Sequence, residues 1–119
     1  MKNKKERMLD AIRLWCFNSG LEEITDNESY YYHTDIAFKK DDKITGFILE
    51  FDKDDEQLMF KMVFSRSLCD YVYVVTDDSK KRKDLIDKIM DEYGLFCYSD
   101  SFGLGYVYQV FKEPKNIIK

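Results

Sequence analysis

The stretch that decides the fold of this chain runs Asp35-Ile-Ala-Phe-Lys-Lys-Asp-Asp-Lys-Ile-Thr-Gly-Phe-Ile-Leu-Glu50. Aromatic and β-branched residues lie on both sides of a short polar segment, a pattern typical of a β-hairpin. We expect strands over residues 30–39 and 43–51, joined by a two-residue turn at Asp41 and Asp42. Such a turn requires positive φ, which Asp tolerates.

The expected turn sets the pairing of the two strands, so that paired residue numbers sum to 83. Asp35 then lies opposite Ile48, and His33 lies opposite Glu50. Because side chains alternate along a strand, these four residues and Asp52 share one face of the hairpin. Diagonal neighbours are roughly 7 Å apart, which lets carboxylates converge on one ion. The opposite face is apolar enough to belong to a core: Tyr32, Thr34, Ile36, Phe38, Thr45, Phe47, Leu49 and Phe51.

Clustered carboxylates repel one another, and a hard cation relieves that repulsion. Mg²⁺ and Mn²⁺ prefer oxygen ligands, so the pattern predicts a metal site formed by Asp35, Glu50 and Asp52. His33, the single histidine, is a further candidate ligand or base. The alternative is a solvated end of a sheet, because 35% of the chain is charged and acidic pairs then arise by chance.

The order of expected elements resembles the PD-(D/E)xK nuclease superfamily, and most closely its small bacterial and phage branches. An acid-bearing hairpin follows a first helix and precedes a second helix and an apolar strand, and Asp35 and Glu50 match the family acids. The resemblance implies an α/β fold: a three-layer α/β/α sandwich with a mixed sheet and an αβββαβ core. It also implies a phosphodiester hydrolase that acts on DNA with Mg²⁺ or Mn²⁺ at Asp35 and Glu50.

The chain departs from the family motif at its cation. The family has acid, any residue, lysine, whereas this chain has Glu50, Phe51 and Asp52. Lys53 is adjacent but is expected to point to the opposite face. Lys61, on the following helix, is the candidate replacement and completes the catalytic set with Asp35 and Glu50. The alternative for Lys61 is an ordinary surface lysine.

The remaining pattern indicates one domain over residues 1–119, with a core over 4–111 and a tail over 112–119. Apolar positions at helical spacing and capping residues predict three helices, at 4–19, from Asp54 or Asp55 to Leu68, and at 80–93. Further strands are expected at 71–76, 95–98 and 105–111. The strand at 71–76 is apolar on both faces, which predicts a central strand parallel to its neighbour.

Composition limits the function classes and the cell compartment. A net charge of −4 argues against broad affinity for nucleic acid but leaves room for a local basic patch. The three cysteines lack paired spacing, which indicates buried free thiols in a reducing compartment. The basic first residues are not followed by a long apolar run, so a cytoplasmic protein without a signal peptide is expected.

Three classes of function remain open from the sequence. The first is the metal-dependent nuclease. The second is a catalytically degenerate member of the fold that binds a protein through its acidic, tyrosine-rich surface, for example as a phage-borne inhibitor. The third is a module that binds nucleic acid without cutting it, against which the negative net charge argues. The partners these classes imply are DNA, another protein or a second copy of the chain, and no membrane is expected.

Overall fold

The structure is a computed structural model, and it describes residues 3–25, 32–51, 53–77, 93–99 and 106–112. The described elements are α1 (Lys4–Asn18), β1 (Glu22–Glu23), β2 (Ile36–Lys40), β3 (Lys43–Leu49), α3 (Asp55–Leu68), β4 (Tyr71–Asp77), β5 (Tyr93–Ser99) and β6 (Tyr106–Lys112). No helix within these ranges combines the length and apolar composition required for a transmembrane span.

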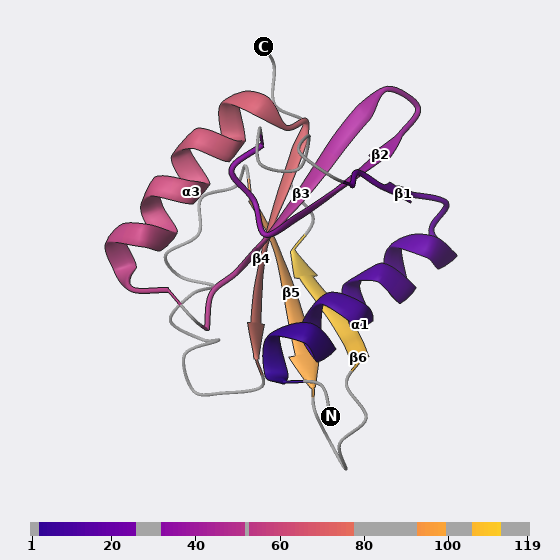
Figure 1. The fold of residues 1–119 in the computed structure, drawn as a ribbon, viewed down its shortest axis with the longest axis horizontal. Helices are drawn as coiled ribbons and strands as arrows, with labels where there is room; N and C mark the ends of the chain where they lie inside the picture. The colour runs from indigo at the N-terminus through magenta and orange to yellow at the C-terminus, as the bar shows by residue number, and fades with distance from the viewer. Residues whose placement is uncertain (1–2, 26–31, 52, 78–92, 100–105, 113–119) are drawn as a thin grey trace.

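The strands form one mixed sheet whose spatial order follows the chain, from β1 to β6. The three central strands β3, β4 and β5 are parallel, and the strands outside them pair antiparallel. α1 covers one face of the sheet and α3 covers the other (Figure 1). The predicted three-layer α/β/α sandwich with a mixed sheet is therefore confirmed, and its first six described elements follow the order α, β, β, β, α, β.

The β2–β3 hairpin has the predicted register. Ile36 pairs with Phe47 and Lys40 pairs with Lys43, so paired numbers sum to 83. Asp41 and Asp42 have φ angles of 51° and 64°, as a two-residue turn with both central residues in the left-handed region requires.

Alternation along β3 divides the core into two layers. Phe47 and Leu49 face α1, and the apolar side chains of that layer are fully or nearly buried. Ile48, between them, faces the opposite way and packs with Leu58 and Met62 of α3. β4 contributes to both layers, as expected for a strand that is covered on both faces.

Local sequence explains where the helices begin and end. Asn3 caps α1 by accepting a hydrogen bond from the Glu6 amide, and Gly20, with φ of 81°, follows the end of the helix. At α3, the Asp54 carboxylate accepts from the Gln57 amide while the Gln57 side chain accepts from the Asp54 amide, which is a complete capping box. Both helices match their predicted ranges to within a residue or two.

The expected start of the first hairpin strand, at residue 30, is wrong. β2 begins only at Ile36, and residues 32–35 form a turn and bend in which His33 has a φ of 55°. β3 likewise ends at Leu49, so Glu50 and Phe51 lie beyond it. Strand alternation therefore cannot be extended to the candidate acids. Tyr32, for example, packs on the α3 side of the sheet and not, as expected, on the face of Ile36 and Phe47.

Three further differences from the expected elements concern residues 22–23, residues 80–94 and α3. Residues 22–23, expected to be an irregular connection, form the short edge strand β1. The helix predicted at 80–93 lies outside the described residues except for Tyr93, which belongs to β5 together with Gly94. Spacing predicts an apolar face of α3 formed by Leu58, Met59, Met62, Val63 and Phe64. Leu58 and Met62 are buried as predicted, together with Ser65, whereas Met59, Val63 and Phe64 are exposed.

Candidate functional site

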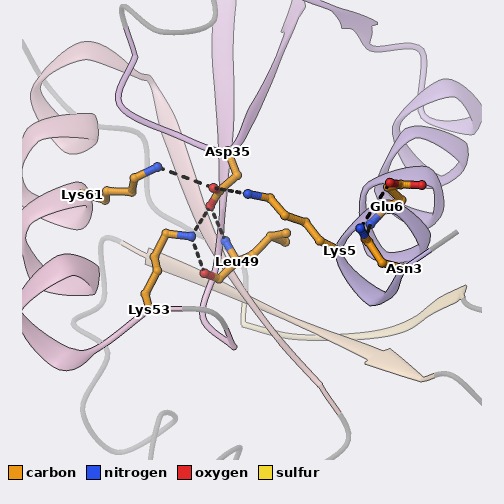
Figure 2. A network of polar contacts seen from close by, with 7 residues as sticks. All are labelled: Asn3, Lys5, Glu6, Asp35, Leu49, Lys53 and Lys61. Carbon is orange, nitrogen blue, oxygen red and sulfur yellow. Dashed lines mark hydrogen bonds and ion pairs between the residues drawn. The ribbon is translucent and has the colours of Figure 1, made fainter.

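An open cleft of about 690 Å³ lies where the central parallel strands end. Asp35 precedes β2 and lies beside the carboxyl end of β3, between the two helical layers (Figure 2). Ligand sites of α/β sheets commonly occur beyond the carboxyl ends of their strands. The residues that line the cleft come from α1, α3 and the segments around β3: Lys5, Asp35, Lys53, Glu56, Gln57, Phe60 and Lys61.

The Asp35 carboxylate closes the β2–β3 ladder. The Asp35 amide donates to the Phe47 carbonyl oxygen at 3.0 Å, and Asp35 Oδ2 accepts from the Leu49 amide at 2.8 Å. The side chain thus takes the place of a backbone acceptor at the last residue of β3. This contact fixes the orientation of the carboxylate at the edge of the sheet.

Lys53 is the closest cation to Asp35. Its Nζ atom lies 2.7 Å from Asp35 Oδ2 and also donates to the Leu49 carbonyl oxygen at 2.7 Å. The two side chains are almost completely buried, with exposed fractions of 7% for Lys53 and 5% for Asp35. Removing both charges from water is costly, so each depends on the other for compensation.

Two further lysines approach the other carboxylate oxygen of Asp35 from opposite layers of the sandwich. Lys61 Nζ of α3 lies 3.5 Å from Asp35 Oδ1, and Lys5 Nζ of α1 lies 3.9 Å from the same atom. Figure 2 shows the two side chains reaching this carboxylate from either side. The exposed fractions of these side chains are 33% for Lys61 and 46% for Lys5, so both lysines remain partly exposed at the cleft.

Glu50 has a different environment from Asp35. Its side chain is buried, its amide donates to the Val75 carbonyl oxygen at 2.9 Å, and Thr76 Oγ1 donates to its Oε2 at 3.4 Å. Within the described residues, no hydrogen bond or ion pair joins Glu50 to Asp35, and Glu50 is not among the residues that line the cleft. The two acids therefore lie near the same edge of the sheet, and Asp35 alone of the two lines the cleft.

The donor set does not fit a divalent metal ion as the described residues stand. Both oxygens of Asp35 face ammonium groups, and a cation placed there would be repelled by three positive charges. The described part of the chain also holds no group of three or more His, Cys, Asp or Glu side chains placed to bind a metal. Asp52, the third predicted ligand, lies outside the described residues.

His33 lies two residues before Asp35 but belongs to the α3 surface. Its ring packs on Phe60 and Phe64, with centroids 6.3 and 5.4 Å apart. This is not the position expected from the sequence, opposite Glu50 on the acid-bearing face of the hairpin, because the turn at residues 32–35 replaces the expected strand.

The main residue that the sequence interpretation missed is Lys53. It was assigned to the opposite face on the assumption that β3 continues through residue 51, and that assumption is wrong. A turn after Leu49 brings Lys53 back, its backbone amide donating to the Glu50 carbonyl oxygen at 3.1 Å. The capping signal at Asp54 was the available clue. A helix that starts at residue 55 requires a turn just before it, so strand alternation should not have been extended to Lys53.

Comparisons of the chain with models of protein families, with curated proteins and with solved structures gave no match. The functional argument therefore depends on the residues of the cleft.

Proposed function

We propose that this chain is a nuclease-like α/β domain that binds a backbone phosphate of a nucleic acid in the cleft around Asp35. The observation that carries the proposal is the convergence of three lysines, from α1, from the segment after β3 and from α3, on one carboxylate. Three ammonium groups and two carboxylates line the cleft, so its charge is positive although the whole chain is negative.

The three lysines have different tasks in this proposal. Lys53 is buried and neutralises Asp35, so it holds the site together. Lys61 and Lys5 lie farther from the carboxylate and are partly exposed, so they supply the charge that attracts an anion. A phosphodiester carries one negative charge on two free oxygens, which accept charge-assisted hydrogen bonds from ammonium groups.

The overall charge of the chain is compatible with a local contact of this kind. Non-specific binding along a duplex depends on many Lys and Arg contacts to phosphate. A chain of net charge −4 with a basic cleft among its described residues is suited to engage a small number of phosphates at a defined place.

Phosphate binding by lysines does not require a metal ion. The resemblance predicts Mg²⁺- or Mn²⁺-dependent hydrolysis at Asp35 and Glu50, and that activity remains a prediction. The arrangement of the described residues gives better support to binding, because Asp35 is engaged by cations of the chain itself. We therefore expect affinity for nucleic acid to be retained in EDTA.

The test is the binding of a fluorescein-labelled oligonucleotide, followed by fluorescence anisotropy in EDTA. Lys61→Gln removes one exposed cation of the cleft and should weaken binding about tenfold, as the loss of one charge-assisted hydrogen bond would. It should also reduce the slope of log affinity against log salt concentration by about 1, because one fewer counterion is released on binding. Lys39→Gln is the matched control, because Lys39 is an exposed lysine near the turn of the β2–β3 hairpin, does not line the cleft and also faces an aspartate, Asp42, at 4.0 Å.

Equal losses for the Lys61 and Lys39 variants, or no binding of any oligonucleotide, would contradict the proposal. The same oligonucleotides incubated with Mg²⁺ or Mn²⁺ test hydrolysis. Cleavage that is abolished by both Asp35→Asn and Glu50→Ala would add catalysis to the binding function.

A further inference from the structure

Exposed aromatic rings lie directly beside the cleft. Phe60 and Phe64 are one helical turn apart on α3, with exposed fractions of 54% and 44% and ring centroids 4.3 Å apart. The ring of His33 packs against both of them. These three residues are called the aromatic strip below. Exposing packed rings to water costs free energy, so a strip of this kind suggests a surface that binds something.

The strip and the cleft share one residue. Phe60 lines the cleft and also forms part of the strip, and Lys61 follows it in the sequence. The aromatic strip is therefore directly adjacent to the lysines of the cleft. A ligand that fits both surfaces must carry an anionic group and, next to it, a flat apolar group.

The turn at residues 32–35 holds the two surfaces together. It places the His33 ring on α3 and, two residues later, the Asp35 carboxylate among the lysines. The close approach of this turn to β3 requires Gly46, since a Cβ atom there would lie 2.5 Å from Thr34 Cγ2. The packing of the Thr34 side chain over Gly46 therefore holds this turn close to β3.

We propose that the cleft and the aromatic strip together bind single-stranded nucleic acid, with an unpaired base stacked on Phe60 and Phe64 and its phosphate at Lys61 and Lys5. This inference rests on the phosphate binding proposed above and adds the class of nucleic acid. Base faces are accessible to an aromatic ring only when the base is unstacked, which favours a single strand over a duplex. The two packed rings form one platform, so one base is expected to stack on it.

A protein partner would also cover an apolar surface, but the charge beside the strip favours a polyanion. Two partly exposed lysines, Lys5 and Lys61, line the same cleft as Phe60 of the strip. A nucleic-acid strand provides a phosphate and an adjacent ring in every nucleotide, and it satisfies both surfaces at once.

The experiment compares a labelled single strand with a duplex of the same sequence and length, in EDTA, by fluorescence anisotropy. The wild-type chain should bind the single strand at least tenfold more tightly than the duplex. Phe60→Ala should weaken single-strand binding about tenfold, in line with the loss of one base–aromatic stack, whereas Phe60→Tyr should retain it. Val63→Ala is the matched control, because Val63 is equally exposed on α3 at 58% but belongs to neither surface.

The outcomes distinguish failure of the stacking inference from failure of phosphate binding. Equal affinity for single strand and duplex, or equal effects of Phe60→Ala and Val63→Ala, would overturn the stacking inference, while a loss caused by Lys61→Gln would still support phosphate binding. Failure of all oligonucleotides to bind would overturn both. Phe60 is half exposed, so its variants should fold, and an unchanged urea midpoint would verify this.

Discussion

Lys53 Nζ lies 2.7 Å from Asp35 Oδ2, and the two side chains form an ion pair that is almost completely shielded from water. The pair joins the start of β2 to the segment before α3, because Lys53 also donates to the Leu49 carbonyl oxygen. Its members are 18 residues apart in the sequence. The integrity of the cleft therefore depends on one buried electrostatic contact.

Replacing Lys53 by Met should destabilise the chain by roughly 3 kcal/mol, because Asp35 is left buried without its nearest cation. The value is set at the low end of the usual range because Lys61 and Lys5 remain near Asp35. Urea unfolding followed by circular dichroism measures the change. Lys39→Met, in an exposed pair, should change stability by less than about 0.5 kcal/mol.

The double variant Asp35→Asn/Lys53→Met should recover most of that stability, since it removes both buried charges while the Asn side chain still accepts from the Leu49 amide. A double-mutant cycle by urea unfolding measures the coupling. Strictly additive effects of the two single substitutions would show that the pair is not coupled as described.

Gly46→Ala should destabilise the chain by about 1–3 kcal/mol, because the new Cβ atom would meet Thr34 Cγ2 at 2.5 Å and Cys69 Sγ at 3.1 Å. Thr34→Ser removes the nearest of these atoms and should restore part of the loss when it is combined with Gly46→Ala. The free energy of unfolding of the two single variants and the double variant tests this. An unaltered stability of Gly46→Ala would mean that the turn moves away from β3 without cost.

Asp54→Ala should cost about 1 kcal/mol, because it removes the carboxylate that accepts the hydrogen bond from the Gln57 amide in the capping box of α3. Asp54→Asn keeps an acceptor for the Gln57 amide and should cost much less. Thermal unfolding of both variants measures the difference. A similar loss for both would attribute the effect to the charge of Asp54 and its favourable interaction with the helix dipole.

Cys16 predicts a pH dependence of stability. Burial, assisted by the negative charge of Glu23, raises the pKa of its thiol to about 12. In the unfolded chain the thiol ionises near its ordinary pKa of about 8.5–9, so above that pH the unfolded state binds fewer protons than the folded state. Stability from this group is complete below about pH 8.5 and falls as pH rises toward 12, by up to about 1.4 kcal/mol per pH unit.

The measurement is the free energy of unfolding at pH 8, 9 and 10 under reducing conditions, for wild type and Cys16→Ala. The slope of the wild type should be steeper than that of the variant, because tyrosines and lysines contribute alike to both. Parallel slopes would show that the buried thiol ionises in the folded state. Slow reaction of Cys16 and Cys69 with iodoacetamide at pH 8, read for each cysteine by peptide mapping, is also expected, since both thiols are buried.

The hairpin and the layer architecture could be predicted because local chemistry specifies them. Asp41 and Asp42 between two apolar runs fix the turn, the turn fixes the register, and the register fixes which of Phe47 and Ile48 faces which helix. Residues 71–76 are apolar on both faces, and they form a strand covered on both sides. These elements depend on periodicity, which is visible in the sequence.

The candidate site was predicted less well, because it lies just outside the periodic elements. Asp35 and Lys61, predicted as catalytic residues, both line one cleft, where they form an ion pair. Lys53 was missed since its position depends on a turn at residues 50–51, where alternation no longer applies. The apolar face of α3 was too wide because spacing alone does not tell which flank of a helix meets the sheet.

The Asp35 carboxylate receives one lysine from each of the two helices that cover opposite faces of the sheet (Figure 2). An anion held by Lys5 and Lys61 would therefore tether α1 to α3 across the end of the sheet. Hydrogen exchange in the first turn of α1 should slow when an oligonucleotide binds, although most of that helix is far from the aromatic strip. Binding at the cleft would then reduce the local opening of α1 away from the sheet.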